Sequence, residues 1–460
     1  MATSYSPPSY GARTARRMAS PRPRRSPAVP VLVLIWGGAA GALALWWQNT
    51  PAVTGTADWL TGAGRITGLL AGYGAAVLVA LMARVPVLER RVGSDRIARW
   101  HAMGGRYTIC LVLAHLALLV CGYALQSGTG IVEQTVTVVL DYPRMLEATI
   151  GTALLLGVGL VSAGAVRRKV PYEVWYYLHL TLYVAIYLAF WHQLAAGAEF
   201  AGNAAAQMAW YALYLGAAAL VLWYRILVPV RLNLRHRLRV ESVVSEAPGV
   251  LSVLIRGERL QSLRAEPGQF FRWRFMTKGL FWSAHPYSLS AVPRPDLLRI
   301  TVKAVGTGSA ALADLRPGTR VWAEGPYGAL TASRRRRSKV MLIAGGVGIT
   351  PLRALFETLP ARPGDLTLIY RAHTTEDLAL RDELEAIADA RGARLFYSVN
   401  LPNGKRAAKL TARTLRKVAP DIAEHDVYVC GPPKMAEAAI SALREAGVPG
   451  RQIHHESFEL

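Results

Sequence analysis

The first half of this chain contains six apolar stretches, each long enough to cross a membrane. They lie near residues 29–47, 64–83, 103–125, 146–166, 173–196 and 207–230. As an α-helix, each stretch spans a hydrocarbon layer of ~30 Å. After residue 231 the pattern becomes that of a soluble protein. The sequence therefore predicts a membrane domain of six helices followed by soluble domains.

Basic residues alternate between the loops and predict the orientation of the spans. Lys and Arg crowd the N-terminal tail, the second loop, the fourth loop and the segment after the sixth span, whereas the other loops carry few charges. The positive-inside rule then places both termini in the cytoplasm, and we expect a multi-pass plasma-membrane protein. A signal peptide is the alternative for the first span, but its removal would break the alternation. Residues 1–28, rich in Pro, Ser and Arg, are expected to be disordered.

The formal net charge of +23 could suggest nucleic-acid binding. Many of the basic residues lie beside spans, however, where anionic lipid headgroups account for them. We therefore expect membrane lipid, and no nucleic acid, as a partner. The three cysteines, Cys110, Cys121 and Cys430, occur in separate sequence settings. They provide no iron–sulfur spacing and no disulfide framework.

Four histidines lie inside the apolar stretches and predict a metal site. His101 and His115 are fourteen residues apart on the third span, and His179 and His192 are thirteen apart on the fifth. On a helix each pair is separated by about 20 Å, which suits two stacked haems. A single membrane histidine is most often a packed residue, but intramembrane ionisable groups are costly and tend to mark function. Both spans run outward, so His101 should face His179 on an inner haem iron, and His115 should face His192 on an outer one.

The helical geometry fits one pair better than the other. A spacing of fourteen returns to within about 40° of the same helix face, whereas thirteen lands about 140° away. We therefore expect either that the fifth helix is locally overwound or that His192 approaches its iron from another direction.

The soluble half begins with short alternating strands that predict a small antiparallel β-barrel. His285-Pro286-Tyr287-Ser288-Leu289-Ser290 follows one of these strands. A tyrosine beside a hydroxyl residue can stack on a flavin ring while the hydroxyl reaches a ring nitrogen, although the hexapeptide could also be an ordinary turn and strand. In Gly306-Thr307-Gly308-Ser309, small residues would let backbone amides approach a pyrophosphate.

A second soluble pattern starts at Lys339 with a strand, the turn Gly345-Gly346-Val347-Gly348-Ile349-Thr350-Pro351 and a helix. Such glycines admit a dinucleotide phosphate at a helix N-terminus, with Thr350 capping, but the turn alone is weak support. Arg371 follows the next strand, where an acidic residue would favour an unphosphorylated ribose, and so it suggests NADPH.

Two further segments each allow two interpretations. A later strand runs into Cys430-Gly431, and a buried structural thiol is the alternative reading of Cys430. The run from Arg334 to Arg337 is either an exposed link between domains or a contact to a cofactor phosphate.

In order, the soluble motifs resemble the ferredoxin–NADP reductase type of flavin module. Joined to six spans with paired histidines, the chain from about residue 30 onward resembles the ferric reductase and NADPH oxidase superfamily. The resemblance implies an all-α six-helix haem domain (29–231), an antiparallel β-barrel FAD domain (232–333) and an α/β parallel-sheet NAD(P)-binding domain (338–460).

The same resemblance implies roles for individual residues. Those expected to contact FAD are His285, Pro286, Tyr287, Ser288, Ser290, Gly308 and Ser309. Those expected to hold the nicotinamide dinucleotide are Gly345, Gly346, Gly348, Thr350, Arg371, Cys430 and Gly431. Phe458 would cover the flavin until nicotinamide displaces it, although Glu459 and Leu460 follow it. Ser288, Cys430 and Phe458 are thus the candidate catalytic residues.

The implied function is electron transfer from cytosolic NADPH, with NADH possible, through FAD and two b-type haems to an acceptor outside. That acceptor could be a ferric chelate, oxygen or a redox partner protein, and oxygen would make the chain a superoxide-producing NADPH oxidase. One alternative is a membrane-anchored flavin reductase whose spans are only structural; another is a transporter or receptor with a fused reductase. The outer loops lack a metal-binding cluster, which disfavours a dedicated high-affinity iron site. The sequence leaves the oligomeric state open.

Overall fold

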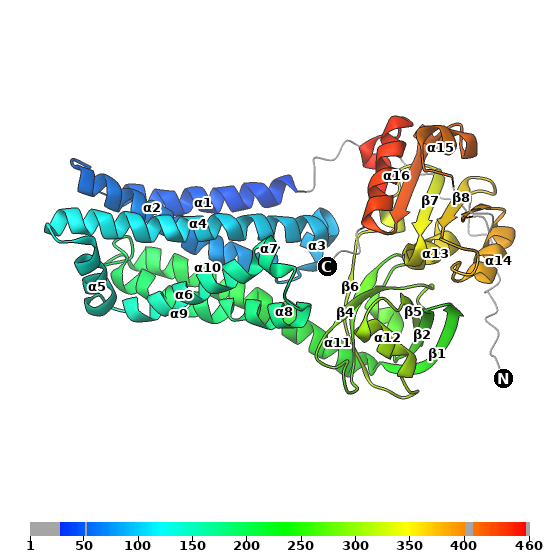
Figure 1. The fold of residues 1–460 in the computed structure, drawn as a ribbon, viewed down its shortest axis with the longest axis horizontal. Coiled ribbons are helices and arrows are strands. Elements are labelled where there is room, and N and C mark those ends of the chain that lie inside the picture. The colour runs from blue at the N-terminus through cyan, green and yellow to red at the C-terminus, as the bar shows by residue number, and fades with distance from the viewer. Residues whose placement is uncertain (1–27, 51–52, 401–407, 457–460) are drawn as a thin grey trace.

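The computed structural model describes residues 28–50, 53–400 and 408–456. A bundle of long helices forms one end of the molecule, and two soluble domains form the other (Figure 1). The predicted disordered tail lies almost wholly in residues 1–27, outside the described residues.

Within the described part of the chain, six helical spans are long and apolar enough to cross a membrane, which confirms the predicted number. Their elements are α1 (Val29–Gln48), α2 (Thr56–Leu81), α4 (Ser94–Ser127), α6 (Met145–Ser162), α8 (Tyr172–Leu180) with α9 (Leu182–Ala196), and α10 (Ala204–Val221) with η1 (Leu222–Leu227) and α11 (Val228–His236). The short helices α3 (Pro86–Val92), α5 (Ile131–Asp141) and α7 (Gly164–Arg167) lie between spans. α5 lies at the end of the bundle far from the soluble domains, whereas α3 lies at the near end (Figure 1).

Glycines on α2 bring its backbone close to α4. A Cβ added to Gly64 would lie 2.8 Å from the Leu119 side chain, and one added to Gly68 would lie 2.5 Å from Nδ1 of His115. Small residues at such a seam let two membrane helices approach closely. The seam therefore places a row of α2 backbone carbonyls beside the α4 side chains.

The fifth span is interrupted at Thr181, between its two histidines. The backbone amide and the Oγ1 of Thr181 both donate to the carbonyl of Leu178, at 3.1 and 2.7 Å. A bond from residue i to i−3 is the tighter winding of a 3₁₀ turn, which advances further around the axis per residue than an α-turn. The tighter winding at Thr181 goes in the direction of the first of the two expected alternatives for the thirteen-residue spacing, and the choice between the two stays a prediction.

The sixth span continues without a break into the soluble half. α10 widens into the π-helix η1 and then narrows again in α11, which begins beside Pro229. Proline has no amide to donate, so a change of helical winding at this point leaves no donor unpaired. The predicted domain boundary at 231/232 falls inside α11, so no loop marks it in the structure. The boundary therefore stays a prediction.

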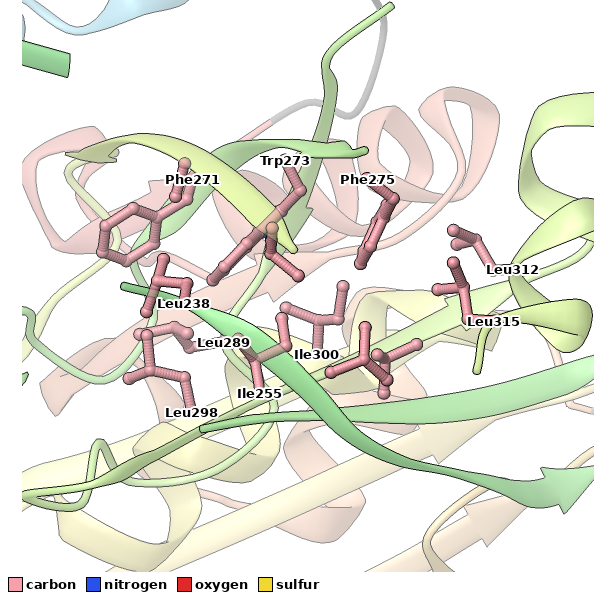
Figure 2. Close-up of a cluster of buried hydrophobic side chains, with 14 of the residues drawn as sticks. Leu238, Ile255, Phe271, Trp273, Phe275, Leu289, Leu298, Ile300, Leu312 and Leu315 are labelled. Atoms are coloured by element: carbon pink, nitrogen blue, oxygen red, sulfur yellow. The ribbon is translucent and has the colours of Figure 1, made fainter. Parts of the chain in front are cut away.

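The first soluble domain consists of two three-stranded antiparallel sheets, ordered β1-β2-β5 and β4-β3-β6. The strands are β1 (Arg239–Ala247), β2 (Val250–Arg256), β3 (Phe270–Phe275), β4 (His285–Ser288), β5 (Leu297–Lys303) and β6 (Val321–Tyr327). Single bridges join Leu289 to Ile300 and Arg239 to Arg320, so the two sheets follow one another around a barrel, as expected. Alternate residues of β3 point into its core: Phe271, Trp273 and Phe275 pack over Leu238 and Ile255 (Figure 2).

The second soluble domain is the expected α/β unit with a parallel sheet, ordered β11-β10-β7-β8-β9. Its strands are β7 (Lys339–Gly345), β8 (Leu366–Arg371), β9 (Arg394–Ser398), β10 (His425–Cys430) and β11 (Ile453–His455). α13 (Ile349–Thr358) and α14 (Arg381–Arg391) share one buried cluster, and α15 (Ala412–Val418) and α16 (Pro433–Glu445) share another. The chain extends from β7 toward β8 and β9 and then crosses back to β10, so the order reverses between β7 and β10. Such a switch point is where open α/β sheets bind ligands.

Candidate functional site

The structure brings the four membrane histidines together in the two predicted pairs. The ring centroids of His101 on α4 and His179 on α8 are 6.0 Å apart. His115 on α4 and His192 on α9 also lie close enough to interact electrostatically. Each pair thus joins the third span to the fifth.

Both α4 histidines are oriented by backbone carbonyls of α2. Nδ1 of His101 lies 3.2 Å from the Leu78 carbonyl oxygen, and Nδ1 of His115 lies 2.7 Å from that of Gly64. A carbonyl can only accept, so Nδ1 is the donor in both bonds. The lone pair of each ring is therefore on Nε2, which is the usual arrangement of a metal-binding histidine.

The ring separation of the inner pair matches that of two imidazoles bound to one iron atom. Two metal–nitrogen bonds of about 2 Å, added to the ring radii, require a centroid separation of about 6 Å. Nδ1 of His179 is buried without a hydrogen-bond partner among the described residues. The donor set and the spacing both fit a bis-histidine haem.

The barrel brings two of the predicted flavin segments together. A Cβ added to Gly308, in α12 (Thr307–Ala310), would lie 3.3 Å from Nε2 of His285 on β4. The ring of Tyr287 lies roughly parallel to that of His285, at 6.2 Å between centroids. Burial raises the pKa of the Tyr287 hydroxyl to about 12. Pro286 and the buried Ser288 lie on the same short strand, which pairs with β3.

Ser290 is fully buried and bonded within the protein. Its Oγ accepts hydrogen bonds from Nε of Arg299 at 3.2 Å and from Oγ1 of Thr301 at 2.7 Å. Arg299 in turn binds both carboxylate oxygens of Glu383 on α14, at 2.5 and 2.9 Å. Ser290 therefore belongs to a polar network that joins the barrel to the parallel-sheet domain, a link that was not predicted from the sequence. Its expected contact with flavin stays a prediction.

Ser309 also has partners within the protein. Its Oγ accepts hydrogen bonds from the backbone amides of Val305 and Gly306, at 3.0 and 3.1 Å. The side chain thereby shapes the turn that presents Gly308 to His285. Its expected contact with a pyrophosphate stays a prediction.

Glycines line the switch point between β7 and β10. A Cβ added to Gly431 would lie 3.1 Å from Cα of Gly345, and one added to Gly348 would lie 2.2 Å from the carbonyl oxygen of Cys430. Gly346 has a φ of +52° and open space around its Cα. Thr350 is buried, and its Oγ1 donates to the Val347 carbonyl at 3.0 Å. A side chain at Gly348 or Gly431 would push apart the ends of β7 and β10, where the predicted dinucleotide-binding residues lie.

Arg371 lies at the same edge, where it pairs in register with Gly345. Arg371 ends β8, the neighbouring strand, and its Nη1 donates to the Ala408 carbonyl at 2.6 Å. Ala408 follows directly after residues 401–407, which lie outside the described residues. Phe458 lies outside them as well, so its position stays a prediction.

Cys430 is fully buried at the end of β10, as the structural alternative required. Burial, followed by the nearby carboxylate of Glu456, raises the pKa of its thiol well above the ordinary value. Glu456 was not among the predicted site residues. A Cβ added to Gly328, at the end of the barrel, would lie 3.1 Å from Oε1 of Glu456, so this carboxylate lies between the two soluble domains. Its place two residues before Phe458 is the signal that could have identified it.

The arginine run is held at the opposite edge of the parallel sheet. Oδ2 of Asp426, near the start of β10, accepts hydrogen bonds from the backbone amides of Arg336, at 2.5 Å, and Arg337. The run leads directly into β7 at its amino end. This position fits a link between domains and not a contact at the glycine-lined edge.

The chain matches three protein families in succession. Residues 67–190 match the ferric reductase like transmembrane component, residues 250–331 an FAD-binding domain, and residues 342–440 an oxidoreductase NAD-binding domain. The first match includes His101, His115 and His179 and ends two residues before His192.

Individual relatives resemble part of the chain. Ferredoxin–NADP reductase B of Sorangium cellulosum is 33% identical over 193 residues, covering 38% of this chain and 77% of the relative. The stachydrine N-demethylase reductase subunit Stc4 of Rhizobium meliloti is 31% identical over 227 residues, covering 46% of this chain but only 64% of the relative. Among solved structures, the ferredoxin reductase in carbazole 1,9a-dioxygenase aligns with a TM-score of 0.42 and 23% identity, covering 49% of this chain and 69% of that one.

Proposed function

We propose a function for this chain as a member of the family that joins a ferric reductase-like transmembrane component to a flavin- and NAD-binding module of the ferredoxin–NADP reductase type. In this proposal it carries electrons from cytosolic NADPH through FAD and two b-type haems to an acceptor outside. The chain is a multi-pass membrane NAD(P)H oxidoreductase; the haems, the direction and the acceptor are the proposal. The observation that carries it is the pairing of His101 with His179 at 6.0 Å.

In this proposal, the role of the membrane domain is to position four imidazoles so that they can bind iron. The carbonyls of Leu78 and Gly64 fix the rings of His101 and His115 with Nε2 free. The two carbonyls are fourteen residues apart on α2, as the two histidines are on α4. This matched spacing supports two haems at different depths, because one helix orients both ligands in the same way.

The soluble domains' part is to bring the nucleotides together. When bound, FAD takes an electron pair as hydride and releases single electrons, which the haems can relay. Gly345, Gly348 and Gly431 keep the switch point narrow, so a dinucleotide can approach the strand ends closely. We propose that Arg371 binds the 2′-phosphate of NADPH there. The buried Cys430 thiol stays neutral next to the proposed nicotinamide position.

Charge supports the proposed orientation. The segment after the sixth span and the second and fourth loops carry many basic residues, and these segments belong to the same end of the bundle as the soluble domains. We propose that this end faces the cytoplasm of a plasma-membrane protein and that electrons leave near α5. A ferric chelate is the first acceptor to test, because the matched membrane component is ferric reductase-like. Oxygen and a redox partner protein are the alternatives.

An anaerobic spectrum of the purified, detergent-solubilised protein tests the proposal. We expect one FAD and two low-spin haems per chain, and NADPH should produce the split or broad α-band of reduced b-type haem. A protein that carries FAD and oxidises NADPH in the presence of a dye, but contains no haem after expression with added haem precursor, would instead be a membrane-anchored flavin reductase.

A further inference from the structure

The two ligands of the inner pair are held in different ways. Nδ1 of His101 donates to the Leu78 carbonyl, whereas Nδ1 of His179 is buried without a hydrogen-bond partner among the described residues. A metal-bound imidazole normally donates its second nitrogen to a carbonyl or carboxylate, which fixes the plane of the ring. Some other contact must therefore fix the plane of the His179 ring.

That contact is an aromatic stack one helical turn earlier. The indole of Trp175 lies over the His179 ring, with centroids 5.0 Å apart and planes inclined by only 26°. Residues four apart on an α-helix lie on the same face, so the backbone of α8 itself sets up the contact. A stack of this kind restrains rotation of the imidazole about its own axis and covers one of its faces.

The indole is itself held from two sides. Its Nε1 donates to Oγ of Ser162, at the end of α6, at 3.1 Å. The guanidinium carbon of Arg167 lies 4.5 Å from its ring centroid, in the geometry of a cation–π contact. Trp175 is therefore a fixed surface and not a freely rotating side chain at a membrane interface.

We propose that Trp175 is the positioning residue of the inner haem. It fixes the plane of the His179 imidazole by stacking, and the same indole binds the guanidinium of Arg167, so that a positive charge is in contact with the ring that stacks on that ligand. A fixed positive charge beside an iron centre favours the reduced state, which carries one electron more. The inference rests on the proposed function, because it assumes that His179 binds haem iron.

α8 also connects this arrangement to the flavin barrel. The hydroxyl of Tyr177 donates to the carbonyl of Trp282, between β3 and β4, at 2.8 Å. The tight turn at Thr181 separates α8 from α9. Trp175 thus lies on a short helix that contacts the barrel at one position and the inner ligand at another.

The test uses the full-length protein in detergent, with Trp175→Leu, Trp175→Phe and Arg167→Met. Trp36→Leu is the matched control, because Trp36 is 71% exposed on α1. Readouts are the haem-to-protein ratio, the electron paramagnetic resonance signals of the oxidised haems and their midpoint potentials. A His179→Leu variant identifies the signal of the inner haem.

We expect Trp175→Leu to shift or remove the inner-haem signal alone, and Trp175→Phe to restore most of it, since a smaller ring can still stack. Arg167→Met should lower the inner midpoint potential without loss of haem. Trp36→Leu should leave both signals unchanged.

Two distinct results would count against the account. If Trp175→Leu and Arg167→Met each leave both haem signals and both potentials as they are in the unaltered protein, the positioning role is wrong. Should Trp175→Leu fail to fold, Arg167→Met decides alone. An unaltered protein without haem would overturn the proposed function itself, and that result is visible before any variant is made.

Discussion

The side-chain amide of Asn233 pairs with both backbone polar groups of Ala323. Its Nδ2 donates to the Ala323 carbonyl at 2.8 Å, and its Oδ1 accepts from the Ala323 amide at 2.8 Å. Nδ2 also donates to the Pro229 carbonyl at 2.7 Å. Asn233 lies on α11, the continuation of the sixth span, and Ala323 lies on β6, an outer strand of its sheet (Figure 1). This buried pairing joins the membrane helix to the barrel much as a neighbouring strand would.

Asn233→Ala should weaken that joint. It leaves the amide and the carbonyl of Ala323 buried without partners, and each such group costs about 1–3 kcal/mol. We expect a lower thermal midpoint and slower haem reduction by NADPH, while dye reduction at the flavin is largely kept. Glu258→Gln is the control at the same joint, since its pair with Arg237, at 3.5 Å, is exposed and such pairs contribute about 0–1 kcal/mol. Equal haem reduction rates in both variants would contradict a coupling role for the joint.

The histidine pairs predict selective haem loss. His192→Leu should reduce the haem-to-protein ratio from two to one and spare the inner haem, because only the His115 pair loses a ligand. His101→Leu should remove the inner haem instead. The pyridine haemochrome assay measures the ratio, and His373→Leu, an exposed histidine of the soluble half, is the control. Full retention of haem in His192→Leu would refute the pairing.

Arg371 should determine the choice of nucleotide. Loss of a charged contact to the 2′-phosphate costs roughly 1.5–3 kcal/mol, which corresponds to about a ten- to a hundredfold loss of affinity. Arg371→Ala should therefore raise the KM for NADPH and barely change that for NADH. Arg381→Gln controls for loss of charge, because Arg381 is exposed on α14 and pairs with Glu385. If the unaltered enzyme uses both nucleotides equally well, Arg371 has no such role.

The features that could be predicted from the sequence are those that produce a repeating pattern along the chain. Apolar length identified the six spans, and alternating strands and glycine turns identified the two soluble domains. The tight turn at Thr181 depends on a side-chain bond to Leu178 that no periodicity reveals. Only the mismatch between spacings of thirteen and fourteen, from which a change of winding was expected, was visible in advance.

Contacts between distant segments could not be predicted in the same way. Ser290 belongs to a flavin-like motif, yet its hydroxyl is bonded to Arg299 and, through it, connected to Glu383, 93 positions further along the chain. The stack of Trp175 on His179 follows from a spacing of four, but aromatic residues are so frequent in this span that the spacing alone did not single it out. Tertiary packing determines which of several similar residues makes the contact.

The buried thiol of Cys430 predicts a pH dependence of stability. Its folded-state pKa is raised, whereas in the unfolded chain a thiol ionises near pH ~8.5. Above that pH the unfolded state has lost a proton that the folded state keeps, so the free energy of unfolding falls as pH rises. Cys430→Ala should therefore lose less thermal stability between pH 8 and 10 than the unaltered protein, by up to about 1.4 kcal/mol per pH unit. Parallel stability curves for Cys430→Ala and the unaltered protein would contradict the prediction.

Transfer of electrons across a sealed membrane is the decisive measurement for the proposed electron path. Vesicles with the soluble half facing out receive NADPH outside and contain an impermeant acceptor, either a ferric chelate or an oxygen-dependent probe, in the lumen. We predict that the luminal acceptor is reduced by the unaltered protein but not by His101→Leu, although both variants reduce a dye on the NADPH side. If the luminal acceptor stays oxidised with the unaltered protein while the outside dye is reduced normally, the spans serve only as an anchor and the account is wrong.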